Sequence, residues 1–409
     1  MQTEFEDPST RAAVTAQYGA SQKIILHQGV YKPAASVADA IFMITGMTIG
    51  AGVLGIPYVV AQVGLKIGLV YIVALGLVML ALNLILGEIA VRTNESLQIP
   101  GLVGKYLGKW AKYFLNTIIV FASYGALLAY IVGEGQALAA LFGGSPVAWS
   151  VVFWSVAGVI VWRGLQTIKS VEKVLSVIVM SIICGLSLYL LKDFKLANWV
   201  YSDLSKIFLP YGVILFALNG TPAIIEAHAL LPRSQKHFRK AVIIGSLIPV
   251  AIYALFALAV AGATGLGTSE VATIGLGEKF GSGVLILGNV FAVLAMAGGF
   301  IGSGIALKQN FVWDNKINKI LAEFLVISVP ILLFVAGIRQ FISILSVAGG
   351  VFIGIEALVL TIVCWQARRK GDIDASRYGL HHFWLLAAPI FLIFGWITVA
   401  NLVKLYLTF

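Results

Sequence analysis

Charge is scarce in this sequence. Only 11% of its 409 residues are Asp, Glu, Lys or Arg, whereas soluble globular proteins carry about 25%. Uncharged apolar runs recur along the whole length, and 60% of the residues are hydrophobic. This composition excludes a large soluble domain and predicts an all-α polytopic membrane protein.

Cysteine and motifs of known catalytic chemistry are also scarce. The two cysteines, Cys184 and Cys364, fall in or at the end of apolar runs, with neither metal-ligand nor disulfide spacing. Gly-x-Ser-x-Gly, His-Glu-x-x-His and paired-cysteine motifs are missing. We therefore expect no metal, no cofactor and no enzymatic activity.

The apolar runs predict eleven membrane spans. Residues 1–35 are polar and mixed, so we expect no cleavable signal peptide there but a cytosolic tail, disordered or lying on the membrane surface. The expected spans are 36–63, 67–91, 113–141, 147–162, 171–191, 206–231, 240–264, 282–307, 318–338, 341–366 and 383–405. Spans 4 and 9 are both short.

The positive charges test this count. With a cytosolic N-terminus, 21 of the 28 lysines and arginines fall in the tail and the alternate loops on the inside, and seven on the outside. The bias alternates through every loop, which supports eleven spans with the N-terminus inside and the C-terminus outside. It also explains the net charge of +10 without a nucleic-acid partner.

The stretch 39–58, DAIFMITGMTIGAGVLGIPY, contains an unusual feature of the first span. Gly50 and Gly52 stand near its middle, followed by Gly55 and Pro57. Glycine and proline are poor helix formers, so the helix is expected to open there. Open backbone at membrane depth persists only where it lines a cavity or is buried in protein, which predicts a binding site.

Span 6 repeats this feature. Asn219-Gly220-Thr221-Pro222 interrupts it near the middle. One such break is commonly a proline kink without a function. The two breaks, however, stand five spans apart. Because five is an odd number, two consecutive units of five spans have opposite orientations in the membrane. Paired interrupted helices in two such inverted halves indicate the substrate site of a secondary transporter.

The motif from Gly46 to Pro57, GMTIGAGVLGIP, resembles the span-1 signature of amino-acid permeases in the amino acid/polyamine/organocation superfamily. It is most similar to the amino acid/auxin and the hydroxy/aromatic amino-acid permease branches, which also carry an acidic residue at a position like Glu88. The resemblance implies a LeuT-type 5+5 inverted repeat, with repeats at 36–191 and 206–366 and an eleventh span at 383–405. It also implies alternating access and an amino-acid substrate.

An amino acid brings two charges that must be desolvated at the midplane. The N–H groups at the span-1 break suit its carboxylate, because a helix N-terminus has positive dipole character. The carbonyls at the span-6 break suit its ammonium group, and Phe216 would flank the substrate. The expected substrate-binding residues are Thr48, Ile49, Gly50, Ala51, Gly52, Phe216, Ala217, Asn219 and Gly220, with Ser123, Tyr124 and Tyr130 of span 3 added by resemblance.

Sodium coupling is the less favoured mode. Sodium-coupled relatives place Ser or Thr hydroxyls in span 8, where this chain has Gly298 and Gly299. A cation site would therefore consist of Gly46, Ile49, Gly299 and Ser303. Proton coupling, or exchange without an ion, is the stronger expectation.

A proton route needs a titratable group inside the membrane. The candidates for proton coupling or gating are Glu226, Glu88 and Glu134, with Glu356 in span 10 as a further intramembrane carboxyl. Glu226, just past the span-6 break, is the first to test. Glu88 lies near the cytosolic end, where an ion-paired gate is an alternative role, and Glu134 lies in the outer part of span 3.

The favoured function is a secondary amino-acid permease in the plasma or inner membrane, working as a monomer among lipids. A sodium-coupled symporter is the first alternative. An ion channel is a second, since broken glycine-rich helices also occur in selectivity filters, but no symmetric filter sequence is present. An intramembrane enzyme would need converging catalytic groups, which the sequence does not offer.

Overall fold

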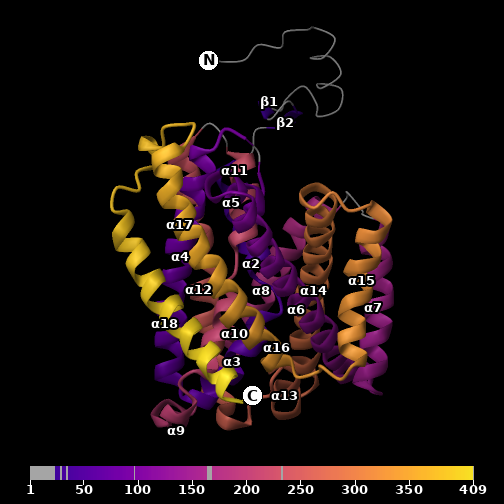
Figure 1. Ribbon diagram of the computed structural model, residues 1–409. Coiled ribbons are helices and arrows are strands. Elements are labelled where there is room, and N and C mark those ends of the chain that lie inside the picture. Colours follow the sequence, from indigo (N-terminus) through magenta and orange to yellow (C-terminus); the bar gives the residue numbers. More distant parts are fainter. Residues whose placement is uncertain are drawn as a thin grey trace.

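The computed structural model describes residues 24–27, 30–33, 36–95, 97–163, 168–231 and 234–408. It is a helical bundle with one small antiparallel strand pair, β1 (Ile24–His27) and β2 (Val30–Pro33), in which Ile24 is opposite Pro33. This pair lies in the segment expected to be a disordered or surface-lying tail. It is drawn beyond one end of the bundle (Figure 1).

In the described part, the first half of the chain forms seven helices: one broken pair, one short helix of nine residues and four long apolar helices. Their bounds are α2 (Val37–Thr48), α3 (Gly52–Val63), α4 (Leu65–Arg92), α5 (Ile99–Leu107), α6 (Lys109–Phe142), α7 (Pro146–Arg163) and α8 (Ile168–Leu190). A capping box between Ser36 and Asp39 starts α2. Gly64, with φ of 103°, makes the turn from α3 into α4, a conformation that favours glycine.

The second half repeats this pattern. Short helices η1 (Leu191–Asp193), α9 (Leu196–Val200) and η2 (Leu204–Lys206) lead into α10 (Leu209–Ala217), α11 (Thr221–Leu230) and α12 (Gln235–Thr264). The loop after α12 holds η3 (Gly265–Gly267) and a short helix, α13 (Ala272–Phe280). The remaining helices are α14 (Ser282–Gln309), η4 (Asn310–Asp314), α15 (Lys319–Val335), α16 (Phe341–Val347), η5 (Ala348–Ile353), α17 (Gly354–Lys370), η6 (Ser376–Tyr378) and α18 (Phe383–Thr408).

All eleven expected spans are helical, but two are short. By length and composition, the described part has eight helices that can cross a membrane, or nine if the bent pair α2 and α3 is one span. Helix α15 has 17 residues, roughly 26 Å at 1.5 Å per residue. For α18, the apolar stretch that the structure describes runs from Phe383 to Gly395.

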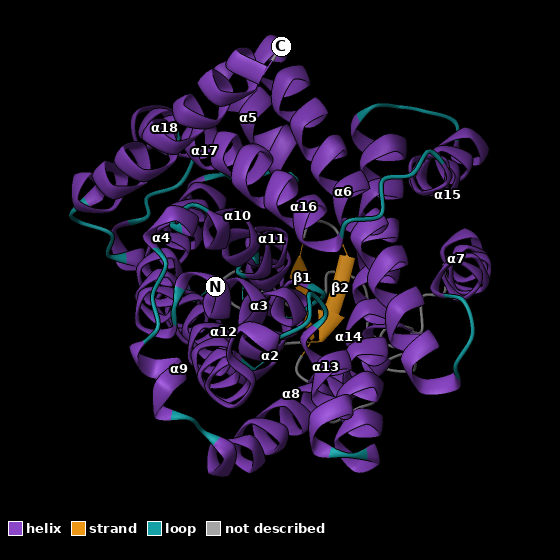
Figure 2. Ribbon diagram, turned by 90° about the horizontal axis from the view of Figure 1, so that it is seen from below, coloured by secondary structure: helices purple, strands orange, loops and turns teal. Residues whose placement is uncertain are grey.

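The broken helices lie inside the bundle. Viewed along its axis, α2, α3, α10 and α11 are surrounded by α4, α12, α8, α6 and α17, whereas α7 and α15 stand at the periphery (Figure 2). Helix α10 packs on α3, and α11 packs on α2. The first half of each broken span thus contacts the second half of the other, as the inverted repeat requires.

Helix α2 begins at the end of the bundle where α5 lies, and α18 ends at the opposite end (Figure 1). This is the arrangement that an odd number of crossings gives. The sequence did not predict the π-helical turn η5 in span 10. It lies against α10, where a Cβ on Gly349 would overlap the carbonyl oxygen of Gly212.

Candidate functional site

The span-1 break is a sharp bend. Helix α2 ends at Thr48 and α3 begins at Gly52, and their axes differ by 59°. The Ile49 N–H still donates to Thr45 at 3.1 Å. No described group accepts a hydrogen bond from the N–H of Gly50 or Ala51. Two donors at the positive end of α3 are thus available for a ligand oxygen.

The span-6 break is gentler and its carbonyls are partly occupied. Helix α10 ends at Ala217, and α11 begins at Thr221. The Phe216 carbonyl accepts from Asn219 N–H at 3.3 Å, and the Ala217 carbonyl accepts from Tyr253 at 3.1 Å. These carbonyls were expected to be open to an ammonium group, and each keeps only one lone pair for that purpose.

The two breaks touch each other through glycines. A Cβ on Gly52 would overlap the backbone of Ala217, and a Cβ on Gly220 would overlap the Thr48 hydroxyl. That hydroxyl donates to Ile44 at 2.7 Å within its own helix. Gly52 therefore permits close packing of α3 on α10, a role distinct from the substrate binding expected from the sequence.

Tyr253 of α12 was missed by the sequence reasoning. It is fully buried, and its hydroxyl lies 3.0 Å from the Thr48 carbonyl oxygen and 3.1 Å from that of Ala217. Both carbonyls belong to last residues of helices, which lack a partner within the helix. No local pattern in span 7 marks this tyrosine, because the contact joins residues 205 and 36 positions apart.

A cavity of about 100 Å³ adjoins the span-1 break. Its walls come from α2, the break, α6, α8 and α14, and none of the lining residues that the structure describes carries a charge. The lining residues are Gly46, Met47, Ile49, Gly50, Tyr130, Ser176, Val179, Leu294, Ala295, Gly298, Gly299, Gly302 and Ser303.

Some of the expected site residues line the cavity and others do not. All four positions expected for a cation site line it: Gly46, Ile49, Gly299 and Ser303. Of the expected substrate-binding residues outside span 3, Ile49 and Gly50 line it, whereas the other seven lie at the contact between the two breaks or in the broken helices beside it.

In span 3, Tyr130 faces the cavity and Tyr124 does not. A Cβ on Gly50 would come 2.9 Å from the Tyr130 hydroxyl, and a Cβ on Gly299 would come 2.5 Å from its ring. The Tyr124 hydroxyl instead donates to the Leu325 carbonyl of α15 at 3.3 Å, and Ser123 donates to Ile119. Residues six apart on a helix point in different directions, which separates the two tyrosines.

The intramembrane carboxyls have different surroundings. Glu134 is fully buried, and neither of its oxygens has a hydrogen-bond partner in the described part of the chain. Glu226 is half-buried on α11. Glu356 is buried and accepts from Thr221, the first residue of α11, at 3.2 Å. Within the described residues, no three His, Cys, Asp or Glu side chains are grouped as metal ligands.

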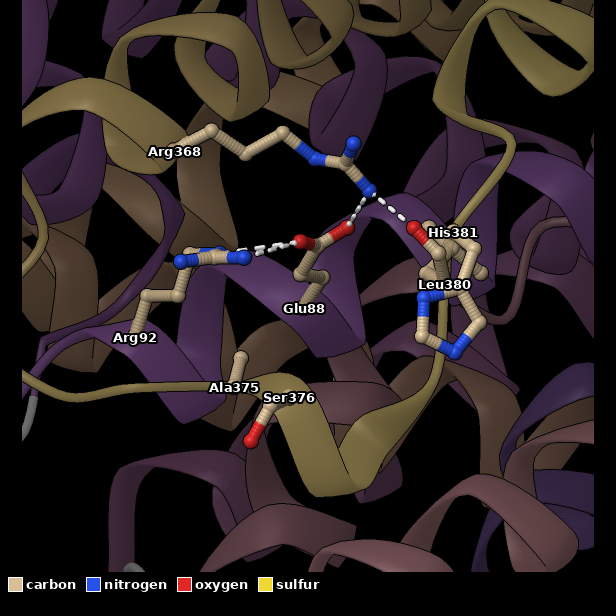
Figure 3. Close-up of a pocket in the computed structure, with 7 residues that line it drawn as sticks. All are labelled: Glu88, Arg92, Arg368, Ala375, Ser376, Leu380 and His381. Atoms are coloured by element: carbon tan, nitrogen blue, oxygen red, sulfur yellow. Dashed lines mark hydrogen bonds and ion pairs between the residues drawn. The ribbon is translucent and has the colours of Figure 1, made fainter.

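Glu88 is held between two arginines (Figure 3). One carboxylate oxygen lies 2.8 Å from an Arg92 nitrogen and the other 2.7 Å from Arg368. Arg368 also donates to the Leu380 carbonyl and lies 4.8 Å from the Phe383 ring centre. Glu88 thus joins the ends of α4 and α17 to the start of α18, matching the ion-paired environment that was its alternative role.

Comparison with known proteins relates this geometry to a family. The model of the tryptophan/tyrosine permease family matches residues 34–400. "Glutamine transporter 2" of Aliivibrio fischeri is 25% identical over 378 residues, covering 86% of this chain and 95% of that protein. "Tyrosine-specific transport system 2" of Haemophilus influenzae is 27% identical over 378 residues, covering 85% and 91%.

A solved structure gives the fold. The crystal structure of MhsT in complex with L-phenylalanine superposes with a TM-score of 0.64 at 17% identity, over 89% of this chain and 99% of that one. The expected LeuT-type fold is therefore confirmed. The chain is a multi-pass membrane transporter that belongs to the tryptophan/tyrosine permease family.

Proposed function

We propose that this chain carries an aromatic amino acid across the membrane by alternating access, coupled to protons. The observation that carries the proposal is the pair of N–H groups at Gly50 and Ala51, which have no acceptor among the described residues and lie beside an uncharged cavity. Such donors suit a carboxylate, and the walls of Met47, Val179 and Leu294 suit an apolar side chain. Relatives named for tyrosine and a neighbour bound to phenylalanine support this substrate class.

A relative named for glutamine offers a second substrate class. A buried glutamine amide needs hydrogen-bond partners. The cavity offers it only the hydroxyls of Tyr130, Ser176 and Ser303 among its described side chains. This lining favours the aromatic class over glutamine.

The cavity has to enlarge for either substrate. Its volume of about 100 Å³ is below the roughly 150 Å³ of an engineered cavity that takes up benzene. Tyr130 stands between Gly50 and Gly299, so a change in its side-chain rotamer would widen the space beside the carboxylate donors. The glycines leave room for that movement.

Proton coupling is favoured over sodium coupling by the chemistry of span 8. Gly298 and Gly299 present no hydroxyl to the cavity, and Ser303 supplies the one span-8 hydroxyl among the lining residues that the structure describes. Among the carboxyls, Glu88 is already paired with arginines. Glu134, buried without a partner in the described part, is the better proton carrier, because an unpaired carboxyl at membrane depth is stable only when protonated.

Glu134 is also suitably placed. It follows Tyr130 by four residues on α6, so the two side chains lie on one helix face a single turn apart. Gain or loss of its proton can therefore act on the tyrosine that occupies the cavity. A sodium-coupled symporter using Gly46, Ile49, Gly299 and Ser303 remains the alternative.

The proposed setting is a plasma or inner membrane with the N-terminus in the cytosol. Helices α4 and α17, whose last residues are Arg92 and Lys370, end at the end of the bundle where α2 begins (Figure 1). The excess of positive charge at that end supports its cytosolic assignment. The proposed working unit is a monomer.

The test is uptake into proteoliposomes. Labelled tryptophan, tyrosine, phenylalanine, glutamine and alanine are offered with a proton gradient or a sodium gradient imposed separately. We expect saturable uptake of the aromatic amino acids that is driven by the proton gradient and does not depend on the sodium gradient. Sodium-driven uptake would replace the coupling proposal, glutamine preference would replace the substrate proposal, and flux without saturation would indicate a channel.

A further inference from the structure

A second hollow, of about 180 Å³, lies apart from the cavity at the ends of α4 and α17. It is lined by Glu88, Arg92, Arg368, Ala375, Ser376, Leu380 and His381 (Figure 3). The ion pairs of Glu88 form one side of it, and the loop between α17 and α18 forms the other. It shares no lining residue with the cavity at the span-1 break.

The charges in this hollow do not balance. Two guanidinium groups face one carboxylate, and their side chains are only 19% and 23% exposed. The nearby loop adds Arg377 and two acids: Asp372, which pairs with Lys105, and Asp374, whose pKa is lowered chiefly by hydrogen bonds from Ser376 and then by Arg92 and Arg377. These loop groups are exposed. Among the poorly exposed groups, the two guanidinium groups exceed the carboxylate by one positive charge, which is costly.

Hydrogen-bond donors remain unused there as well. Arg368 employs one terminal nitrogen for both Glu88 and Leu380, and its Nε is buried without a partner in the described part. A guanidinium group has five N–H donors in a planar fork that matches phosphate oxygens. An anion with several oxygens would satisfy both the charge and the donors.

The surroundings favour an anion attached to a lipid. Phe383, against which Arg368 stacks, begins α18, and the next two residues are strongly exposed: Trp384 at 66% and Leu385 at 71%. A tryptophan beside a basic pocket is typical of the headgroup level of a bilayer. Basic pockets between membrane helices at this level bind anionic headgroups.

We propose that this hollow binds the phosphate group of an anionic phospholipid, with its acyl chains along α18. Arg92 and Arg368 would hold the phosphate oxygens, with Ser376 and His381 at the rim. The bound lipid would secure the α17–α18 loop against Glu88. This site is independent of the substrate and of the coupling ion proposed above.

The test uses purified protein in an uncharged detergent. Short-chain phosphatidylglycerol, short-chain phosphatidylcholine and inorganic phosphate are titrated separately, and the thermal unfolding midpoint is followed. We expect phosphatidylglycerol to raise the midpoint at the lowest concentration, phosphatidylcholine to have no effect, and phosphate to act far more weakly. Equal action of phosphate and phosphatidylglycerol would overturn the lipid assignment, and no effect of either would overturn the site.

Two variants that each add one negative charge test whether phosphatidylglycerol binds in the hollow. Ser376→Glu puts a carboxylate on the rim and leaves both ion pairs of Glu88 intact. Gln98→Glu puts one on an exposed residue of a neighbouring loop that does not line the hollow. We expect Ser376→Glu to weaken phosphatidylglycerol binding about fivefold or more, as for one basic contact with an anionic headgroup, and Gln98→Glu to leave it unchanged. Equal loss in both variants, or none in Ser376→Glu, would contradict binding in this hollow.

Discussion

The Tyr253 hydroxyl donates to the carbonyl of Thr48, the last residue of α2, at 3.0 Å. The same hydroxyl lies 3.1 Å from the carbonyl of Ala217, the last residue of α10. Because a hydroxyl has one hydrogen, the two carbonyls share it. One side chain of span 7 thereby fixes the distance between the two broken helices.

Replacing this hydroxyl should loosen both breaks. Tyr253→Phe leaves two buried carbonyls without a partner, which costs about 1–3 kcal/mol of unfolding free energy. We expect a lower thermal midpoint and a raised KM for the substrate, measured on purified protein and in proteoliposomes. Tyr113→Phe is the control, since Tyr113 is 58% exposed. Equal behaviour of the two variants would contradict the bridging role.

Gly52 should be intolerant of a side chain for a packing reason. Its Cβ would overlap the backbone of Ala217, so Gly52→Ala should destabilise the protein by about 1–3 kcal/mol and reduce uptake with it. Gly283→Ala serves as control, because a Cβ there meets nothing within 4 Å. If Gly52→Ala kept full thermal stability while losing substrate binding, direct contact with the substrate would be the better explanation.

Glu134 and Glu226 can be separated by one pair of variants. Glu134→Gln keeps the shape of the side chain but cannot exchange a proton. We expect it to abolish accumulation driven by a proton gradient while retaining counterflow exchange of labelled substrate. Glu226→Gln, at a half-buried position, should retain both. The reverse pattern would transfer the coupling role to Glu226.

Glu88 should contribute to stability far more than an exposed acid. Glu88→Gln leaves Arg92 and Arg368 facing each other, and loss of one partner from a buried ion pair costs about 3–5 kcal/mol. Glu95→Gln removes a pair with Lys105 whose acid is 63% exposed, so it should cost about 1 kcal/mol or less. The unfolding free energies of the two variants are measured by chemical unfolding in detergent. Similar losses of unfolding free energy would show that the burial of Glu88 contributes little.

Asp372 should stabilise the loop after α17 only above acidic pH. Hydrogen bonds from Lys105 and from the Asn94 N–H lower the pKa of Asp372 below its usual range. A depressed folded-state pKa contributes stability above the unfolded value of about 3.9, and that stability is lost as the pH falls through the folded value. Asp372→Asn should therefore lower the thermal midpoint most at pH 7, and this difference should shrink progressively as the pH falls below about 3.9. A difference of constant size from pH 7 down into the acidic range would contradict the assignment.

Much of the fold followed from local chemistry. The glycines at 50 and 52 and the run Asn219-Gly220-Thr221-Pro222 weaken a helix wherever they stand, so both breaks could be predicted from the sequence. Apolar length and alternating positive charge predicted the spans. The strand pair near residue 30 and the π-helical turn at Ala348–Ile353 were missed, since neither has a strong local pattern.

The site was only partly predictable, because its residues meet through packing. The sequence by itself placed the N–H donors of the first break and the glycines of span 8. Only the tertiary structure decided that Tyr130 faces the cavity and Tyr124 faces α15, that Gly52 contacts Ala217, and that Tyr253 joins both breaks. Helix rotation and helix contact depend on all neighbours at once, whereas a helix break depends on a few adjacent residues.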